Sequence, residues 1–182
     1  MTGLPTQAAD VLAFWRDAGP ERWFRKDDAF DAAFRERFLG LHEQAAAGAL
    51  DDWADTADGA LALLILLDQF PRNAFRGTAR VYATDPQARR IAQQALARGD
   101  DTRVQAELRP FLVLPMMHSE DPADQALSVE KTAPIGGENH RFALHHQDIV
   151  RRFGRFPHRN AVLGRASTPE EERFLAEGGF TG

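Results

Sequence analysis

The amino-acid sequence predicts an all-α fold, an array of antiparallel helical hairpins with about eight or nine helices and no sheet. Alanine and leucine, which favour helices, are more than twice as common as valine, isoleucine and threonine together. Helix start and stop signals recur along the chain, and no long polar linker interrupts them. A chain of 182 residues can hold one hydrophobic core. We therefore expect residues 1–182 to form a single helical domain.

The first two long helices are predicted from the spacing of their apolar residues. Thr6 is a suitable N-cap for a helix that carries Val11 and Trp15, and the Gly-Pro pair at 19–20 ends it. A second helix is expected from about 28 to 47, where a helical stripe of apolar residues recurs. The members of this stripe are Phe30, Phe34, Phe38, Leu41 and Ala45.

The middle of the chain contains two strongly apolar segments. ALALLILLDQF (60–70) is apolar on every side, which indicates a helix buried in the core, and we expect Pro71 to end it. ELRPFLVLPMM (107–117) is the second, and its two prolines limit it to a short or kinked helix. Between these segments, Pro86 begins a helix that Gly99 ends.

Three more helices are predicted in the last third of the chain. One spans about 121–130, and another spans about 138–152. The second of these is expected to place one set of side chains on a single face: Phe142, His146, Ile149 and Phe153. Near the end, Thr168 and Glu171 form the pattern of a capping box, with a proline at the first helical position.

Composition and charge exclude several classes of function. The chain has no cysteine, which excludes disulfides, thiolate nucleophiles and cysteine-ligated metal sites. The net charge of −5 provides no overall positive field toward nucleic acid or anionic lipid. No stretch approaches the ~20 apolar residues of a membrane span, and the first residues lack the pattern of a signal peptide. We therefore expect a cytoplasmic protein that binds neither nucleic acid nor membranes and has no cofactor.

Three segments place polar residues directly after an apolar stretch, and these are the candidate sites. They are LLDQFPRNAFRGTARVYATD (66–85), PMMHSED (115–121) and RRFGRFPHRNAVLGR (151–165). The last contains five arginines and no carboxylate, so its positive charge needs an anion, a distant carboxylate or water. The candidate residues are Asp68, Gln69, Arg72, Arg76, His118, Glu120, Arg155, His158, Arg159 and Asn160.

A resemblance to a known bacterial family is carried by three stretches: LLDQFPRNAFRG, MHSE and RFGRFPHRNAVLGRASTPEE. They resemble the characteristic stretches of the domain-of-unknown-function family nine-two-four, which belongs to the tetratricopeptide-like helical superfamily. The resemblance extends from VLAFW (11–15) to the last helix, and it implies a tetratricopeptide-like fold. It assigns no catalytic residue, because the family has no established activity.

The arginines have a structural and a functional interpretation. In the structural one, Arg152, Arg155 and Arg159 form ion pairs with Asp68 or Glu120, or hydrogen bonds to helix C-terminal carbonyls, and lock the hairpins together. Alternatively, they converge with Arg72 and Arg76 on one surface and hold a phosphate or carboxylate. Asp68 and its neighbours are also suited to hydrogen-bond the backbone groups that are freed where the buried helix ends.

The histidines are open to two interpretations as well. His146 lies on the apolar face of its helix, where a core histidine bonded to a neighbour is the usual case. Alternatively, it is a general acid or base that Glu120 orients. His158 suits proton transfer or the capping of a short helix. Together with His118 these are ligand types for a metal, but their spacing matches no metal motif, so no metal is predicted.

Two functional hypotheses follow. In the first, the three polar segments meet around a pocket for a small phosphate or carboxylate ligand, with His146 or His158 near Glu120 for proton transfer. Hydrolysis or transfer at a phosphate or carboxyl group suits these residue types. In the second, a non-enzymatic helical scaffold binds a peptide or protein in its groove, and the arginines stabilise the frame. The sequence does not distinguish an enzyme from a scaffold, and it does not give the oligomeric state.

Overall fold

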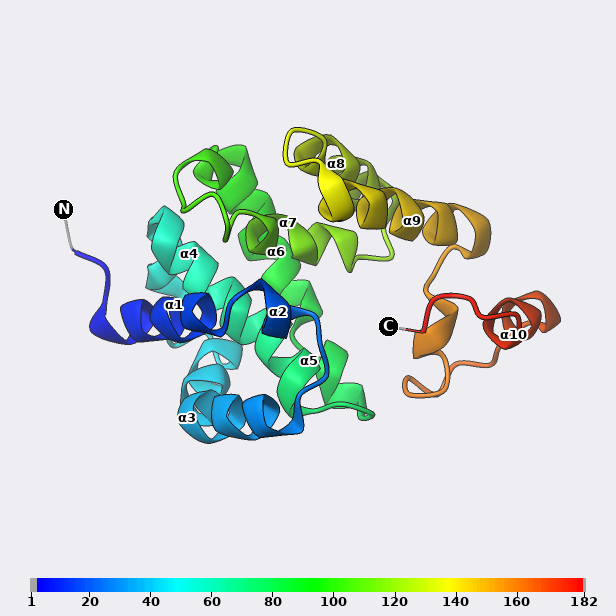
Figure 1. Cartoon of the computed structure of the whole chain (residues 1–182), viewed down its shortest axis with the longest axis horizontal. Coiled ribbons are helices and arrows are strands. Elements are labelled where there is room, and N and C mark those ends of the chain that lie inside the picture. Colours follow the sequence, from blue (N-terminus) through cyan, green and yellow to red (C-terminus); the bar gives the residue numbers. More distant parts are fainter. Residues whose placement is uncertain (1–2, 182) are drawn as a thin grey trace.

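A computed structural model of the chain describes residues 3–181 and shows an all-α fold, with no strand among these residues (Figure 1). The predicted fold class is therefore confirmed. The α-helical segments are α1 (Thr6–Ala18), α2 (Pro20–Trp23), α3 (Asp28–Ala46), α4 (Ala57–Leu64), α5 (Phe70–Ala74), α6 (Asp85–Ala97), α7 (Pro110–Met117), α8 (Pro122–Thr132), α9 (Gly137–Phe153) and α10 (Pro169–Ala176). Shorter turns are the 3-10 segments η1 (Asp51–Asp55), η3 (Ala79–Tyr82), η4 (Asp100–Thr102) and η5 (Pro157–Arg159), and the π-helical turn η2 (Ile65–Gln69).

The first three helices pack around aromatic side chains. The apolar stripe of α3 is buried as predicted except for Leu41, which is partly buried. The ring of Phe34 lies 5.3 Å from that of Phe14 and 5.4 Å from that of Trp15 in α1. Trp23 belongs to α2 and donates its indole N–H to the Trp15 carbonyl at 2.7 Å. Full burial of one such side chain contributes about 1.5–3 kcal/mol. These contacts attach the N-terminal helices firmly to the core.

The buried segment 60–70 departs from its prediction, because Pro71 does not end it. The chain passes from α4 through η2 into α5, and Pro71 lies in the first turn of α5. In η2 the N–H of Phe70 donates to the carbonyl of Ile65, five residues back. Proline is tolerated here because the first turn of a helix does not need its missing N–H. The widened turn contains Asp68, which is buried.

Helices α6 to α9 pack against one another in chain order, and Figure 1 shows α8 and α9 side by side. Helix α7 begins at Pro110, later than the expected 107, and Pro115 lies inside it without ending it. In α9 the buried face contains Ala143 and His146, whereas Phe142 is 41% exposed. Phe142 was expected to share a face with His146, but it lies outside the buried face of α9.

Two helix starts test the capping predictions. Pro5, and not Thr6, occupies the N-cap position of α1, and no side chain caps that helix. Thr6 instead begins the helix. At α10, the side chain of Thr168 accepts from the N–H of Glu171, and the Glu171 carboxylate accepts from the N–H of Thr168 at 2.7 Å. The predicted capping box is therefore confirmed.

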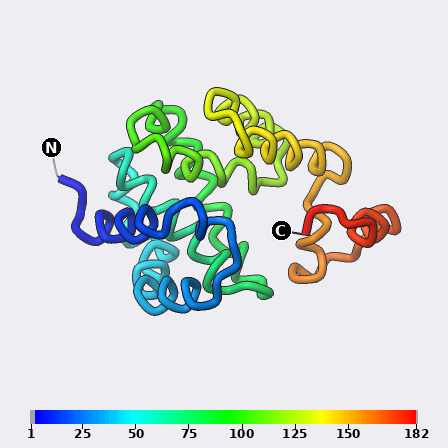
Figure 2. The backbone as a smooth tube through the Cα atoms, in the orientation of Figure 1, coloured from blue at the N-terminus to red at the C-terminus, as the bar shows by residue number. Residues whose placement is uncertain are grey.

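The segment that follows α9 forms a small apolar cluster of its own. This cluster is separate from the main core, and its buried members are Ile149, Val150 and Phe156, with Phe153, Phe174 and Phe180 packed against them. Figure 2 shows the red C-terminal end of the chain returning to the orange segment around η5. No helix among residues 3–181 combines the length and hydropathy that a bilayer-spanning segment needs. The single-domain organisation stays a prediction.

Candidate functional site

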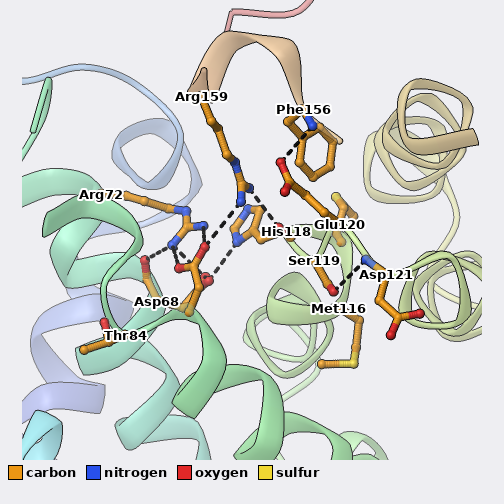
Figure 3. Close-up of polar contacts among 12 residues, drawn as sticks. Asp68, Arg72, Thr84, Met116, His118, Ser119, Glu120, Asp121, Phe156 and Arg159 are labelled. Atoms are coloured by element: carbon orange, nitrogen blue, oxygen red, sulfur yellow. Dashed lines mark hydrogen bonds and ion pairs between the residues drawn. The ribbon is translucent and has the colours of Figure 1, made fainter. Parts of the chain in front are cut away.

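A buried carboxylate orients a histidine at the centre of the site. Asp68 lies in η2 with its side chain 1% exposed, and His118 is the C-cap of α7. Nδ1 of His118 lies 2.8 Å from Oδ1 of Asp68 (Figure 3). Because an ionised carboxylate only accepts hydrogen bonds, Nδ1 carries the proton and Nε2 of His118 is left as an acceptor. This is the arrangement that a general base requires.

The charges around this pair fix its protonation state. Burial opposes ionisation of Asp68, but Arg72 and His118 outweigh burial and lower the pKa of the carboxyl to about 2. Burial is also the main cause that lowers the pKa of His118, and the Arg72 guanidinium lowers it further. At neutral pH the pair is therefore a carboxylate beside a neutral imidazole.

Arg72 is fully compensated by carboxylates. Its guanidinium donates to both oxygens of Asp85 at 2.9 and 3.0 Å, and Nη1 lies 3.1 Å from Oδ1 of Asp68. Gln69 donates to the other Asp68 oxygen at 2.6 Å. These contacts join η2 to the start of α6.

Arg159 has less compensation than Arg72. Its Nη2 donates to the carbonyl of His118 at 2.8 Å, and Nη1 lies 3.5 Å from Oδ2 of Asp85. The rings of Tyr82 and Phe156 lie 4.5 and 4.6 Å from the guanidinium carbon. The side chain is 9% exposed, and within residues 3–181 its Nε has no hydrogen-bond partner. A buried cation with an unsatisfied donor is the feature that an anion would complete.

Two further histidines lie beside this group. The ring of His146 is 6.5 Å from that of His118, and its Nδ1 lies 2.8 Å from the carbonyl of Phe142, as expected of a core histidine. Burial, with a smaller effect of His118, lowers the pKa of His146 to about 3. Burial and then Arg159 lower the pKa of His158 to about 4. Nδ1 of His158 is buried and lacks a partner in the described part of the chain.

Glu120 does not orient a histidine, which corrects the expected pairing with His146 or His158. Its two oxygens accept from Arg165 at 2.7 and 3.0 Å, and Oε1 also accepts from the backbone N–H of Phe156 at 2.8 Å. Burial raises the pKa of Glu120, but the hydrogen bonds from Arg165 and Phe156 outweigh it. The guanidinium provides two parallel bonds, which an imidazole cannot match.

Three predicted residues form contacts elsewhere. Arg155 donates to both oxygens of the buried Glu171 at 2.6 and 2.8 Å, and Asn160 donates to Glu171 at 3.3 Å. Arg76 pairs with Asp31 of α3 at 2.7 Å. The first two side chains hold the C-terminal segment together, and the third attaches the turn after α5 to α3. The structure thus brings together Asp68, Gln69, Arg72, His118 and Arg159, with His146 and His158 beside them.

The sequence model of a bacterial family of unknown function, DUF924, matches residues 11–179 of this chain. The chain belongs to this family. A solved structure of a protein of unknown function from Agrobacterium tumefaciens is similar to it, at 52% sequence identity and a TM-score of 0.93. That alignment covers 95% of this chain and 98% of the other. Among curated proteins, none matches.

Sequence reasoning missed two residues of this DUF924 site, Asp85 and Tyr82. Asp85 was not among the candidate residues, yet it pairs with Arg72 and approaches Arg159. A signal existed, because Asp85 is the first acid after an arginine-rich stretch that has none. Tyr82 is the single tyrosine of the chain, and no pattern around it marks its position over Arg159.

The clearest surface hollows of the DUF924 chain lie away from these residues. One of about 410 Å³ is lined by Phe14, Phe30 and Arg37, and another of about 410 Å³ by Leu12, Leu61 and Leu108. Neither is lined by Asp68, His118 or Arg159. Within residues 3–181 no three histidine, aspartate or glutamate side chains are arranged to hold a metal ion.

Proposed function

We propose that this DUF924 protein binds a small anionic ligand beside Arg159 and that the Asp68–His118 pair transfers a proton during hydrolysis or group transfer at the ligand's phosphate or carboxyl group. One observation carries the proposal. A neutral imidazole, oriented by a buried carboxylate, lies next to a buried guanidinium whose Nε has no hydrogen-bond partner within residues 3–181. Acid–base groups with strongly shifted pKa values are typical of active sites.

The chemistry follows from the proton on His118. With Nδ1–H bonded to Asp68, Nε2 accepts a proton from a water or hydroxyl that attacks the ligand. Asp68 then stabilises the imidazolium that forms, as a buried carboxylate does in hydrolytic triads. The imidazolium returns this proton to the leaving group as the bond between that group and the phosphorus or carbonyl carbon breaks. Arg159 neutralises the negative charge that grows on the reacting group. Positioned proton transfer of this kind accelerates a reaction by about 10²–10⁴-fold.

The ion pairs leave one of the candidate arginines to bind the anion. Arg72 is paired with two carboxylates, and Arg155 is paired with Glu171. Of these three arginines, Arg159 is the one with a buried N–H that has no partner within residues 3–181, so the ligand carries one compact anionic group and not an extended polyanion. Such a ligand is a metabolite of the cytoplasm, the location expected from the sequence.

The second candidate function is a tetratricopeptide-like scaffold that binds a peptide or protein. The pairing of Arg72, Arg155 and Arg165 with carboxylates supports it, because such pairs serve the frame. Phe142 and Leu144 support it as well, since these α9 side chains are 41% and 45% exposed. Specific capture of one protein by the wild type, lost in Leu144→Asp and kept in Arg159→Met, would favour the scaffold over the anion site.

Thermal unfolding with inorganic phosphate, phenyl phosphate and benzoate tests the anion site. A ligand at a hundredfold excess over its Kd stabilises the fold by about 2.7 kcal/mol, which raises Tm by roughly 5–10 °C. We expect this rise in the wild type and in Arg80→Met, a surface control, but not in Arg159→Met. An equal rise in both variants, or no rise with any anion, would refute binding at Arg159.

Hydrolysis of p-nitrophenyl phosphate and p-nitrophenyl acetate tests the proton transfer. His118→Asn is expected to lower kcat by about 10²-fold or more for whichever substrate is cleaved. The exposed neighbour of His146 provides a control, and His145→Asn should keep the wild-type rate. If His118→Asn retained that rate, the assigned role of the pair would be wrong.

A further inference from the structure

The C-terminal tail inserts an aromatic ring among the histidines of the site. The ring of Phe180 lies 4.6 Å from that of His146 and 5.1 Å from that of His158, both edge-on. Phe156 lies 5.4 and 5.7 Å from the same two histidines. These distances are those of favourable edge-to-face pairs. We call Phe156, His146 and His158 the ring box, and Phe180 is the side chain packed against it.

Two glycines fold the tail back to the ring box. Gly178 has a φ of +85°, which favours glycine, and the N–H of Gly179 donates to the carbonyl of Phe174 at 2.9 Å. A Cβ at Gly179 would lie 2.5 Å from that carbonyl oxygen, so no other residue fits without a shift. Figure 2 shows the resulting return of the chain toward η5. The local sequence therefore brings Phe180 to the histidines.

Within residues 3–181, packing alone holds the inserted ring, because neither Phe180 nor Thr181 takes part in a hydrogen bond or ion pair there. Nδ1 of His158, in the ring box, is buried and has no partner among these residues. The same holds for Nε of Arg159, whose guanidinium carbon lies 4.6 Å from the centroid of the Phe156 ring. In the described part of the chain, the ring that fills this apolar position therefore has no polar contact to lose.

We propose that the ring box is a subsite for an aromatic ring of the ligand, and that Phe180 occupies it until that ring displaces it. This inference rests on the proposed anion site and names the ligand class: a small aromatic phosphate or carboxylate. Its anionic group binds at Arg159 and His158, while its ring takes the place of Phe180. Phe180 therefore competes with the ligand and lowers its affinity in the wild-type chain.

Isothermal calorimetry with phenyl phosphate and inorganic phosphate measures this competition. Phe180→Ala is expected to bind phenyl phosphate about tenfold more tightly than the wild type, the worth of two aromatic contacts, with phosphate affinity unchanged. Gly179→Ala keeps the ring but prevents the return of the tail, so it should act alike. Phe24→Ala, at an exposed phenylalanine outside the cluster, is the control. Unchanged or weaker binding of phenyl phosphate by both tail variants would overturn the proposal.

Acylation of histidines by diethyl pyrocarbonate gives a readout without ligand. We expect His158 to react several times faster in Phe180→Ala and Gly179→Ala than in the wild type, and phenyl phosphate to protect it. An unchanged rate in both variants would show that the tail does not cover the ring box, and would overturn the inference while leaving the anion site intact. If the proposed anion site is wrong, the result is different: neither phosphate nor phenyl phosphate binds the wild type or any variant, and the inferred ligand class is then wrong as well.

Discussion

Replacing Asp68 with asparagine removes one buried charge and almost no volume. Asparagine keeps an acceptor for His118 but loses the attraction to Arg72 and the imidazole. Folding lowers the pKa of Asp68 from 3.8 to about 2, which corresponds to roughly 2 kcal/mol of stabilisation of the charged form. We therefore expect Asp68→Asn to lower the free energy of unfolding by about 2–3 kcal/mol at pH 7.

The sign of the pH dependence follows from the direction of this pKa change. Because the pKa is lower in the folded chain, the stabilisation is fully present above the unfolded value of 3.8 and is lost as pH falls through about 2. Asparagine does not titrate in this range. The gap in unfolding free energy between wild type and variant should therefore narrow as pH falls from about 4 to about 2.

Urea unfolding followed by tryptophan fluorescence measures both quantities, because Trp15, Trp23 and Trp53 are buried. Asp10→Asn, on the exposed side of α1, is the control and should stay within about 0.5 kcal/mol of the wild type. A loss below about 0.5 kcal/mol for Asp68→Asn at pH 7 would refute the reasoning. So would a gap that keeps its full size at the acid end of this range.

Three further predictions concern the frame. Thr168→Ala removes the capping box of α10 and should cost about 1 kcal/mol in thermal unfolding, with phosphate binding retained; loss of binding would contradict a purely local role. Gly59→Ala places a Cβ 2.1 Å from the carbonyl oxygen of Trp53, so urea unfolding should show a free energy of unfolding lower by about 3 kcal/mol. An unchanged free energy of unfolding would disprove the close approach. Trp23→Phe leaves the buried carbonyl of Trp15 without its donor, and a loss of about 1–2 kcal/mol is expected by calorimetry, whereas an unchanged Tm would argue against that hydrogen bond.

Most helices could be predicted because their signals are local. The stripe of α3, the proline that opens α6 and the capping box of α10 all act within a few residues of the element they define. Pro71 misled the prediction for the opposite reason. It is a strong local stop signal, but the surrounding helices hold the chain in a widened turn in which proline costs little. Tertiary packing, which leaves no local sequence pattern, therefore decides that the helical chain continues through Pro71.

The site could be predicted in its segments but not in its pairs. Polar residues that follow buried apolar stretches correctly marked Asp68, His118 and Arg159 as neighbours. Which carboxylate meets which histidine depends on side-chain directions across packed helices, and the bond between Asp68 and His118 joins residues 50 positions apart. Glu120 was expected beside His146 or His158, whereas Arg165, 45 positions along the chain, binds it in the fold. Phe180 had no signal apart from the two glycines that precede it.

The widened turn η2 sets the direction in which the Asp68 carboxylate points. That direction therefore depends on the number of residues in the turn before Asp68, and not only on the presence of an aspartate. Each residue of a regular helix advances the chain by roughly 100° around the axis. An in-frame deletion of one residue ahead of Asp68 would restore regular winding and turn the carboxylate away from His118 by about that angle. Two homologues can thus share every side chain of the site and differ in whether the proton-transfer pair exists. In a sequence alignment, a one-residue gap at this turn would distinguish the two homologues, whereas the identities of the aligned site residues would not.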